Sequence, residues 1–445
     1  MAVKPRATFH FPTGFLWGTA TAAYQVEGNT TNSAWWDWEQ QPGRIRNGDR
    51  SGLACDWWGG RWREDFDRAA EGGQNAHRLS VEWSRIQPTP DRWAEDAIDH
   101  YRQMARGLVE RGMTPMVTLH HFSDPRWFLE QGGWSSEACV EKFAAFVRKV
   151  VEALKEYVST WVTINEPNVF AYCAYVIGVF PPGEHGLSKA FPVMENLVRA
   201  HAAAYQVIHA LQPGARVGLA INYQSFHARR EWFLPDRWVA RIAHTLFNEF
   251  FPRAVYDGRL NFIYKRASLP QAAHTQDFIG INYYTRYYLK FNPVSPGTLF
   301  ADQSFPPEIE TGDNGWYANT PDGMFEALRW GRRFGLPMMV TENGIEDAED
   351  RIRPRYLAEH VHELWRAVNF NYPVKGYFHW TLVDNFEWER GWTQRFGLWA
   401  LDRETQVRRK RPSANLYAEM CKENGLSAEM VEKYCPEVFE KLFPV

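Results

Sequence analysis

Two glutamates stand at the ends of apolar, strand-like runs, where a carboxylate is least expected. Glu342 lies in "LPMMVTENGIED" (336–347), and Glu166 lies in "WVTINEPNVF" (161–170). An unpaired charge is costly to bury, so carboxylates at these places indicate function. Two facing carboxyl groups can cleave an acetal, because one donates a proton to the leaving oxygen while the other attacks the anomeric carbon. The pair therefore predicts cleavage of a glycosidic bond.

The elements that must position these residues alternate along the chain between short apolar runs and longer helical patterns. Strands are predicted over 15–25, 76–83, 113–121, 158–165, 215–222, 277–284, 336–343 and 374–384. Helices are predicted over 62–73, 94–111, 136–156, 192–211, 236–256, 322–334 and 355–370. Such alternation predicts parallel β/α units and a single α/β domain over 1–445, a (β/α)8 TIM barrel. An open doubly wound sheet is the alternative, but no glycine-rich phosphate loop opens the first helix.

The ends of the predicted strands carry the residues that could form a site. The longest connections, 26–60, 166–190, 285–320 and 385–412, all follow the C-terminal end of a strand. Barrel enzymes build their active sites on that face. Polar or aromatic residues end several strands: Gln25, His121, Asn165, Glu166, Asn282, Glu342 and Trp380. In a barrel, Glu166 ends the fourth strand and Glu342 ends the seventh. These strands lie on well-separated sides of the ring, so the two side chains can reach inward from opposite walls.

Five motifs connect the chain to a known family. They are "FLWGTATAAYQVEG" (15–28), "TINEP" (163–167), "GINYYT" (280–285), "VTENG" (340–344) and "LVDNFEWERGWTQRFGL" (382–398). One such motif alone is a weak signal, but all five occur in the order found in glycoside hydrolase family 1. The chain resembles this family from about Phe11 to Tyr417, which implies a (β/α)8 β-glycosidase.

The resemblance also implies a role for individual residues. Glu166 matches the family's acid/base, and Glu342 matches its nucleophile. Asn165 matches the residue that binds the sugar 2-hydroxyl. The other matches are Gln25, His121, Glu387 and Trp388 for the remaining hydroxyls, Trp380 for the floor beneath the sugar, Trp316 for an aglycone platform, and Arg78 and Tyr284 beside the nucleophile, with Asn282 as a supporting residue.

These roles make physical sense for the two carboxyl groups. A cation such as Arg78 near Glu342 is expected to keep that carboxylate ionised, as a nucleophile requires. Glu166, in a dry position near a negative partner, is expected to hold its proton towards neutral pH. When Glu342 loses its charge in a glycosyl-enzyme, the pKa of Glu166 should fall, so Glu166 can act as a base on water.

Some residues depart from the family pattern or compete for a role. In "LHHFSDP" (119–125), no metal site is expected, because adjacent residues of a strand point to opposite faces. Phe122 and Ser123 stand there in place of a common tryptophan and aspartate. Asn168 replaces a frequent tryptophan and predicts a more polar aglycone side. Glu82, a rival strand carboxylate, is interpreted as a salt-bridged structural residue.

Composition limits the classes of function. The net charge of the 445 residues is −3, which does not favour binding to nucleic acid or to an acidic membrane. The basic segment "QVRRKRPSANLY" (406–417) is interpreted as a solvated turn before a helix. Five scattered cysteines lack CxxC spacing, so neither a zinc site nor a disulfide framework is expected. With no apolar leader and no run long enough to cross a bilayer, the cytoplasm is the expected location.

The sequence thus predicts a retaining β-glucosidase that needs no cofactor and acts on small β-glucosides and short oligosaccharides. A 6-phospho-β-glycosidase and a non-catalytic sugar-binding relative are the alternatives. Glu387 argues against the first, because a carboxylate repels a phosphate, and the presence of both Glu166 and Glu342 argues against the second. The preference among glucose, galactose and fucose, the extent of transglycosylation and the choice between monomer and homo-oligomer stay open.

Overall fold

The computed structural model describes residues 6–295 and 298–444, and its centre is a closed barrel of parallel strands. The barrel strands are β2 (Leu16–Ala20), β3 (Ala76–Ser80), β4 (Thr114–His120), β5 (Thr160–Asn165), β6 (Arg216–Asn222), β10 (Phe278–Asn282), β13 (Met338–Asn343) and β14 (Val374–Trp380). They neighbour one another in chain order, and β14 pairs with β2 to close the ring. The predicted (β/α)8 fold is confirmed.

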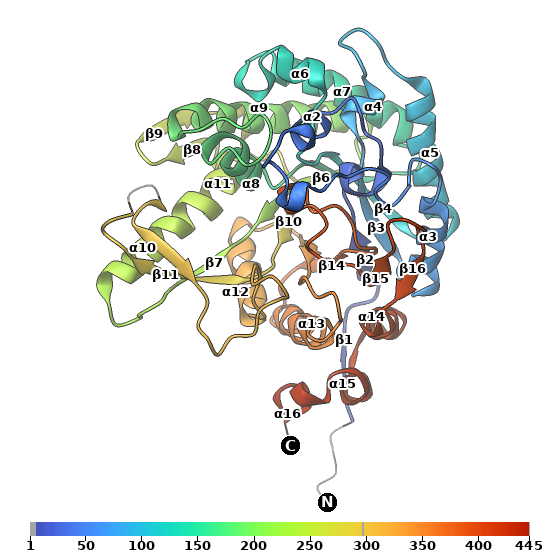
Figure 1. Ribbon diagram of the computed structural model, residues 1–445, viewed down its shortest axis with the longest axis vertical. Coiled ribbons are helices and arrows are strands. Elements are labelled where there is room, and N and C mark those ends of the chain that lie inside the picture. Colours follow the sequence, from blue (N-terminus) through green and yellow to red (C-terminus); the bar gives the residue numbers. More distant parts are fainter. Residues whose placement is uncertain (1–5, 296–297, 445) are drawn as a thin grey trace, which may run out of the picture.

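Helices surround the barrel on its outside (Figure 1). They include α3 (Trp62–Glu71), α5 (Glu95–Glu110), α7 (Cys139–Leu154), α9 (Leu187–Leu211), α10 (Leu234–His244), α11 (Phe250–Asp257), α12 (Asp322–Gly331), α13 (Arg353–Asn369) and α14 (Pro412–Glu423). The helix predicted over 236–256 is present as a helical run from Leu234 to Asp257, in which the π-helical segment Thr245–Glu249 joins α10 to α11. There Asn248 donates a hydrogen bond to the Gln224 carbonyl at 2.8 Å, a tertiary contact that periodicity does not reveal.

Burial on both faces explains the sequences of the barrel strands. Every residue of β13 is buried, as is every residue of β5 and β10. A strand enclosed by side chains inside the barrel and helices outside has no solvated face, so it reads as a continuous apolar run. The polar residues at the ends of these strands are therefore enclosed with them.

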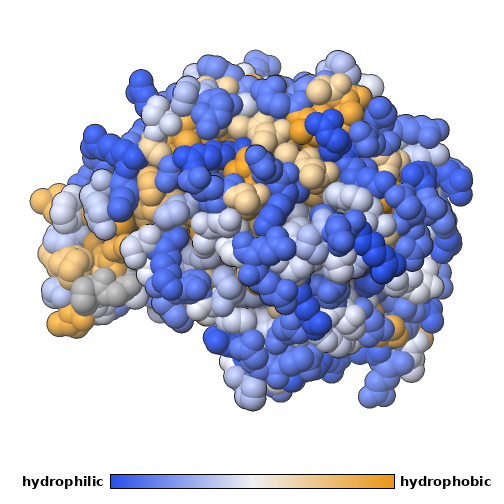
Figure 2. Space-filling model, turned by 90° about the horizontal axis from the view of Figure 1, so that it is seen from above, coloured by the Kyte–Doolittle hydropathy of each residue, from blue (hydrophilic) through white to orange (hydrophobic). Residues whose placement is uncertain are grey.

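The long connections after the strands build the surroundings of the barrel mouth. The segment 285–320 carries β11 (Arg286–Phe291) and β12 (Ala301–Ser304), which form a small sheet with β7 (Ser225–Ala228). This sheet and α10 make a lobe beside the barrel (Figure 1). Figure 2 shows apolar side chains on the same lobe, where the exposed large side chains include Trp232, Leu234, Trp238 and Val294.

The basic segment 406–417 differs from the interpretation as a solvated turn. It forms β16 (Arg408–Lys410), which pairs with β15 (Trp399–Leu401), and then enters α14. Arg408 and Arg411 are buried, and they form ion pairs with Asp65 and Asp384 respectively. The prediction was wrong because both counter-ions come from distant parts of the chain.

Across the described ranges, no helix combines the length and apolar character needed to span a membrane.

Candidate active site

The two glutamates lie at the barrel mouth, on strands three steps apart in the ring, and both are buried. Glu342 is the fifth residue of β13, and Glu166 directly follows β5. Strands β6 and β10 lie between β5 and β13 in the barrel. The register sets Asn282 of β10 beside both Asn222 of β6 and Glu342. Two amide side chains thus fill the wall between the carboxyl groups.

These two asparagines hydrogen-bond Glu166 directly, and one of them also connects it to the residues around Glu342. Asn222 and Asn282 each donate from Nδ2 to Oε1 of Glu166 at 2.8 Å. Asn282 also donates to Oδ1 of Asn165 at 3.2 Å, and Asn165 accepts a hydrogen bond from Arg78, the guanidinium that pairs with Glu342. Sequence reasoning missed Asn222, although it ends the run "ARVGLAIN" with the same polar strand-end signal that marked Asn282.

Glu342 is held by a cation and a phenol. Nη1 of Arg78 donates to Oε1 of Glu342 at 2.6 Å, and the Tyr284 hydroxyl donates to Oε2 at 2.5 Å. Nη2 of Arg78 donates to Oδ1 of Asn165 at 2.6 Å. The structure therefore brings together four of the predicted site residues: the nucleophile Glu342, Arg78 and Tyr284 beside it, and Asn165. Hydrogen bonds of this kind stabilise the ionised form of a carboxyl group.

The pKa values of the two carboxyl groups follow from burial and from these neighbours. Burial, followed by the negative charge of Glu342, raises the pKa of Glu166 to about 8. Burial also raises the pKa of Glu342, while Arg78, Tyr284 and Asn282 oppose that rise. The elevated value for Glu166 agrees with the expected proton donor. For Glu342 the sequence prediction considered only the cation that favours ionisation, and burial acts on its pKa in the opposite direction.

The backbone around Glu166 is in an uncommon conformation. Glu166 has a φ of 41°, in the left-handed region, and Pro167 begins the short helix α8 (Pro167–Ala171) at the next residue. Phe122 and Trp388 also have positive φ angles, of 64° and 47°. Non-glycine residues rarely adopt this conformation, and their occurrence together is typical of functional sites.

Gln25 lies in a different element from the predicted one. Strand β2 ends at Ala20, and Gln25 belongs to the short helix α1 (Ala23–Glu27). The predicted strand was too long because the turn after β2 is itself apolar and buried. Nε2 of Gln25 nevertheless donates to Oε2 of Glu387 at 3.1 Å, as expected for residues of one site. Its buried Oε1 atom has no hydrogen-bond partner among the described residues.

His121 lies among the aromatic side chains of the same site. Its ring is stacked on that of Trp388, with centroids 5.9 Å apart, and lies 6.0 Å from that of Trp380. Nε2 of His121 lies 3.0 Å from Nδ2 of Asn165. The adjacent His120 instead pairs with Asp124. Among the described residues, no group of three or more His, Cys, Asp or Glu side chains could hold a metal ion.

The structure also shows the surroundings of Glu82 and Asn168, the two residues that were interpreted from the sequence as a salt-bridged glutamate and as a polar residue of the aglycone side. Glu82 accepts hydrogen bonds from the hydroxyls of Ser84 and Ser123 at 2.7 and 3.0 Å. Its structural role holds, but the predicted salt bridge is wrong, because Arg85 pairs with Glu27 instead. Asn168 is 2% exposed, and Nδ2 of its side chain donates to backbone carbonyls. Its Oδ1 atom has no hydrogen-bond partner among the described residues, and the more polar aglycone side stays a prediction.

Trp316 lies in the predicted neighbourhood but does not offer an open platform. Its ring is stacked on that of Tyr317, and the guanidinium of Arg390 lies over it. Neither contact was predicted. Tyr317 is adjacent to Trp316 in the sequence, and Arg390 follows the predicted site residue Trp388 by two positions. Only the folded chain brings these segments into one stack.

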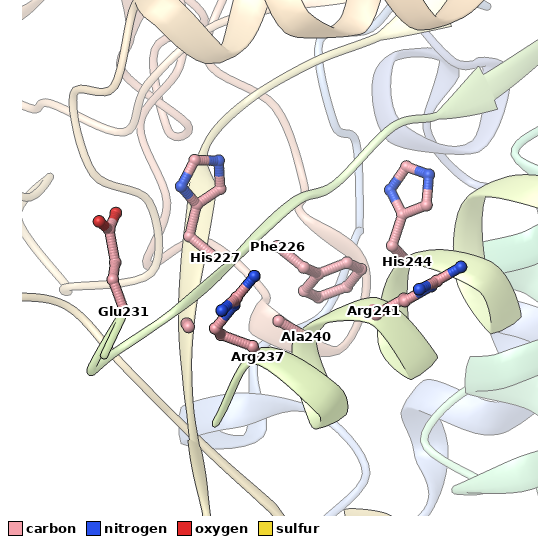
Figure 3. Close-up of a pocket in the computed structure, with 8 residues that line it drawn as sticks. Phe226, His227, Glu231, Arg237, Ala240, Arg241 and His244 are labelled. Atoms are coloured by element: carbon pink, nitrogen blue, oxygen red, sulfur yellow. The ribbon is translucent and has the colours of Figure 1, made fainter. Parts of the chain in front are cut away.

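A groove of about 500 Å³ lies away from these residues, between β7 and α10 (Figure 3). Its lining comprises Phe226, His227, Ala228, Glu231, Arg237, Ala240, Arg241 and His244. In Figure 3 the side chains of Arg237 and Arg241 come from α10, while His227 comes from the facing strand. None of the predicted site residues lines the groove, so it is separate from the site around the two carboxyl groups.

Comparison with known proteins agrees with this geometry. The family model described as glycosyl hydrolase family 1 matches residues 7–426. The chain is 34% identical to beta-glucosidase A of Thermotoga maritima over 94% of this chain and 98% of that protein. It is 30% identical to a beta-galactosidase of Saccharolobus solfataricus over 95% and 97% of the two chains.

The same relationship appears in three dimensions. The solved structure of a beta-glycosidase from Pyrococcus horikoshii superposes with a TM-score of 0.89 and 35% sequence identity, covering 96% of this chain and 98% of that one. The matched motifs, the closed barrel and these relatives lead to one conclusion. The chain is a glycoside hydrolase that belongs to glycosyl hydrolase family 1.

Proposed function

We propose that this enzyme is a retaining β-glucosidase that removes the terminal non-reducing glucose of short oligosaccharides and of aryl or alkyl β-glucosides. The observation that carries the proposal is the short chain of hydrogen bonds between the two carboxyl groups: Arg78 donates to both Glu342 and Asn165, and Asn282 donates to both Asn165 and Glu166. Such closeness suits the double displacement, in which retaining enzymes hold their carboxyl groups about 5–5.5 Å apart.

In the first half-reaction, Glu342 attacks the anomeric carbon and Glu166 gives its proton to the departing aglycone oxygen. Arg78 and Tyr284 orient the attacking carboxylate through their hydrogen bonds. The bond from carbon to the aglycone oxygen breaks as the bond to the Glu342 oxygen forms. Glu166 is suited to the acid role because its raised pKa keeps the proton in place at neutral pH.

In the second half-reaction, water replaces the aglycone. The ester formed with Glu342 carries no negative charge, so the repulsion that raises the pKa of Glu166 is relieved. Glu166, now a base, takes a proton from water, which attacks the anomeric carbon and frees Glu342. Two inversions at that carbon give net retention. An alcohol in place of water would give transglycosylation.

The sugar specificity rests on Gln25 and Glu387 and on the rings around them. Glu387 is 6% exposed and accepts a hydrogen bond from Gln25, so it can bind sugar hydroxyls as an acceptor. Among the residues that the structure describes, the side chain that donates to Glu387 is the neutral amide of Gln25 and no cation lies at hydrogen-bond distance, so a phosphate here would meet an uncompensated carboxyl group. This arrangement favours an unphosphorylated sugar over a 6-phosphate. Nitrophenyl β-glucoside, β-galactoside, β-fucoside and glucoside 6-phosphate, compared by kcat/KM, rank the candidates.

Azide rescue tests the proposed roles. Glu342→Ala and Glu166→Ala should each lower turnover by several orders of magnitude. Azide should restore Glu342→Ala with an inverted glycosyl azide, because it attacks directly. It should restore Glu166→Ala with a retained product, because it attacks the glycosyl-enzyme. The opposite stereochemistry would reverse the two roles, and full activity of either variant would refute the mechanism.

We also propose the cytoplasm as the site of action. All five cysteines are free, and four of them are buried. Free cysteines without disulfides are typical of proteins in a reducing compartment.

A further inference from the structure

Four planar groups form a continuous stack beside Glu342. The ring of Tyr284 is stacked on that of Tyr317, with centroids 4.8 Å apart and an interplanar angle of 17°. Tyr317 is stacked on Trp316 at 4.5 Å and 14°. Cζ of Arg390 lies 4.4 Å from the centroid of the Trp316 ring. The stack therefore contains Tyr284, Tyr317, Trp316 and Arg390.

The order within the stack follows from steric exclusion. Tyr284 and Trp316 are both nearly parallel to Tyr317 and close to its centroid. Two rings so placed on one face would overlap, so they occupy opposite faces of Tyr317. By the same argument, Arg390 covers the face of Trp316 that Tyr317 leaves free. Trp316 is thus enclosed between two groups and has no free face for a flat aglycone.

The stack runs from the reacting groups towards the aglycone side. Tyr284 donates its hydroxyl to Glu342 at the inner end. The negative charges of Glu166 and Glu387 both contribute to raising the pKa of Tyr317. Arg390 shares the short helical turn Trp388–Arg390, and its N–H donates to the Glu387 carbonyl at 2.8 Å, which sets it beside the predicted sugar-binding residues. Arg390 is thus the outer end of the stack, on the side that Trp316 is predicted to line for an aglycone.

The backbone beneath the stack is fixed by a buried carboxyl group. Oε1 of Glu346 accepts the N–H groups of Trp316 and Tyr317 at 3.0 and 3.2 Å. Glu346 is 1% exposed, so these hydrogen bonds are shielded from water. Trp316 consequently has little freedom to turn away from Arg390, and the guanidinium keeps its place over the ring.

Arg390 retains free hydrogen-bond donors. Its Nε donates to Oε1 of Glu389 at 3.2 Å, and within the described residues its two Nη atoms make no hydrogen bond. The Arg390 side chain is 31% exposed, so the Nη groups are accessible. Among the described residues, Glu389 thus engages only Nε of the guanidinium, and its carboxylate competes with any acidic group that approaches Arg390.

We propose that Arg390, and not the face of Trp316, receives the aglycone, and that it selects aryl β-glycosides whose aglycone carries a carboxylate. This inference rests on the proposed function. A guanidinium can form two parallel hydrogen bonds to a carboxylate and can stack on an aromatic ring. A neutral apolar aglycone would gain only the stacking. Arg390 is therefore a specificity-determining residue.

The test compares 4-carboxyphenyl β-glucoside with its methyl ester, which has the same ring but no charge. The ratio of their kcat/KM values is measured for the wild type and for Arg390→Gln. The loss of a charge-assisted hydrogen bond should lower this ratio about tenfold. The different reactivity of the two leaving groups cancels, because each variant is compared with the wild type on the same pair.

Two further variants sharpen the result. Arg63→Gln removes another cation over a tryptophan, in the outer helix α3, and should leave the ratio unchanged. Glu389→Gln removes the opposing carboxylate and should raise the ratio. An unchanged ratio in Arg390→Gln, or an equal fall in Arg63→Gln, overturns the inference. If Arg390→Gln does not fold, Glu389→Gln decides the question. A kcat/KM ratio in Glu389→Gln that equals the wild-type ratio or lies below it then overturns the inference.

The proposed function is tested separately with nitrophenyl β-glucoside on the wild type. If that substrate is not cleaved, the proposed function fails, and the inference is decided by binding alone. Free 4-hydroxybenzoate and its methyl ester are then titrated against the wild type and Arg390→Gln by calorimetry. Tighter binding of the acid, lost in Arg390→Gln, supports the selection, and equal affinities refute it.

Discussion

At the scale of single residues, the two carboxyl groups differ in what surrounds them. Glu342 receives hydrogen bonds from a guanidinium and a phenol, whereas two neutral amides reach Glu166. A charged donor favours the ionised form of its acceptor more strongly than a neutral amide does. The surroundings therefore separate a proposed nucleophile from a proposed acid, although both residues are buried glutamates.

The pH dependence of the enzyme should report this difference. The general acid must carry its proton, so kcat/KM should fall as the pH rises through the Glu166 pKa of about 8. In Glu342→Gln the negative neighbour is gone, and the pKa of Glu166 should decrease while burial keeps it above its usual range. Carboxyl NMR of labelled glutamate measures it. An unchanged Glu166 pKa in that variant would contradict the coupling between the two groups.

Tyr284→Phe should weaken the nucleophile without emptying the cavity. It removes the hydrogen bond to Oε2 of Glu342, worth about 1.5–3 kcal/mol for a charged acceptor, so kcat/KM should fall about 10–100-fold. Loss of this donor also raises the pKa of Glu342, and the acidic limb of the profile should move to higher pH.

Tyr283→Phe is the matched control for Tyr284→Phe. The Tyr283 hydroxyl donates to the Thr320 carbonyl at 2.6 Å and does not contact either carboxyl group. This variant should lose stability but keep the position of the acidic limb. An equal shift of that limb in both variants would show that Tyr284 acts through packing alone.

At the scale of elements, a buried ion pair links the connection that follows β14 to one of the helices around the barrel. Arg408 in β16 pairs with Asp65 in α3, and both side chains are fully buried. Asp65 also pairs with Arg68 on the same helix. The segment that follows the predicted site residue Glu387 is thus attached to a helix more than 300 positions earlier in the chain.

Asp65→Asn should lower the free energy of unfolding by about 3–5 kcal/mol, because it leaves a buried guanidinium without its counter-ion. Thermal denaturation measures the loss. Asp67→Asn, the same substitution on the same helix, removes a half-exposed partner of Arg111 and should cost at most about 1 kcal/mol. Similar losses in the two variants would mean that burial of the pair contributes nothing.

At the scale of the whole molecule, we propose that the chain forms one domain closed by its two ends. Strand β14 pairs with β2, and the Tyr417 hydroxyl donates to the Gly18 carbonyl at 2.5 Å. Outside this closure, β1 (Thr8–His10) pairs with β17 (Gly425–Ser427). Helices α15 (Ala428–Tyr434) and α16 (Phe439–Leu442) follow at the end of the chain, near the start of the described chain (Figure 1).

A chain that ends at Ser427 should be less stable but equally active. It loses the stacking of Phe443 on Phe9 and the ion pair between Lys441 and Glu359. Loss of this apolar burial should lower the free energy of unfolding by a few kcal/mol and the Tm by several degrees. Melting curves measure the stability, and kcat/KM on nitrophenyl β-glucoside at 25 °C should stay within about twofold. An unchanged Tm would contradict the structural role of this tail.

The sequence alone determined the barrel and its carboxylate residues. Strand-length apolar runs separated by helical patterns predict parallel β/α units, because each pattern reflects burial of a local segment. Glu166 and Glu342 were found because a charge at the end of a buried strand is costly. The family motifs then identified partners such as Gln25, whose element was nonetheless misassigned.

Only the tertiary structure decided which distant side chains share an environment. Asn222 between the carboxyl groups, the counter-ions of Arg408 and Arg411, and the guanidinium over Trp316 all join residues far apart in the chain. Local periodicity records whether a residue is buried but not which neighbour it meets. Hydrogen bonds, ion pairs and pKa shifts depend on that neighbour, so they arise only when the barrel closes.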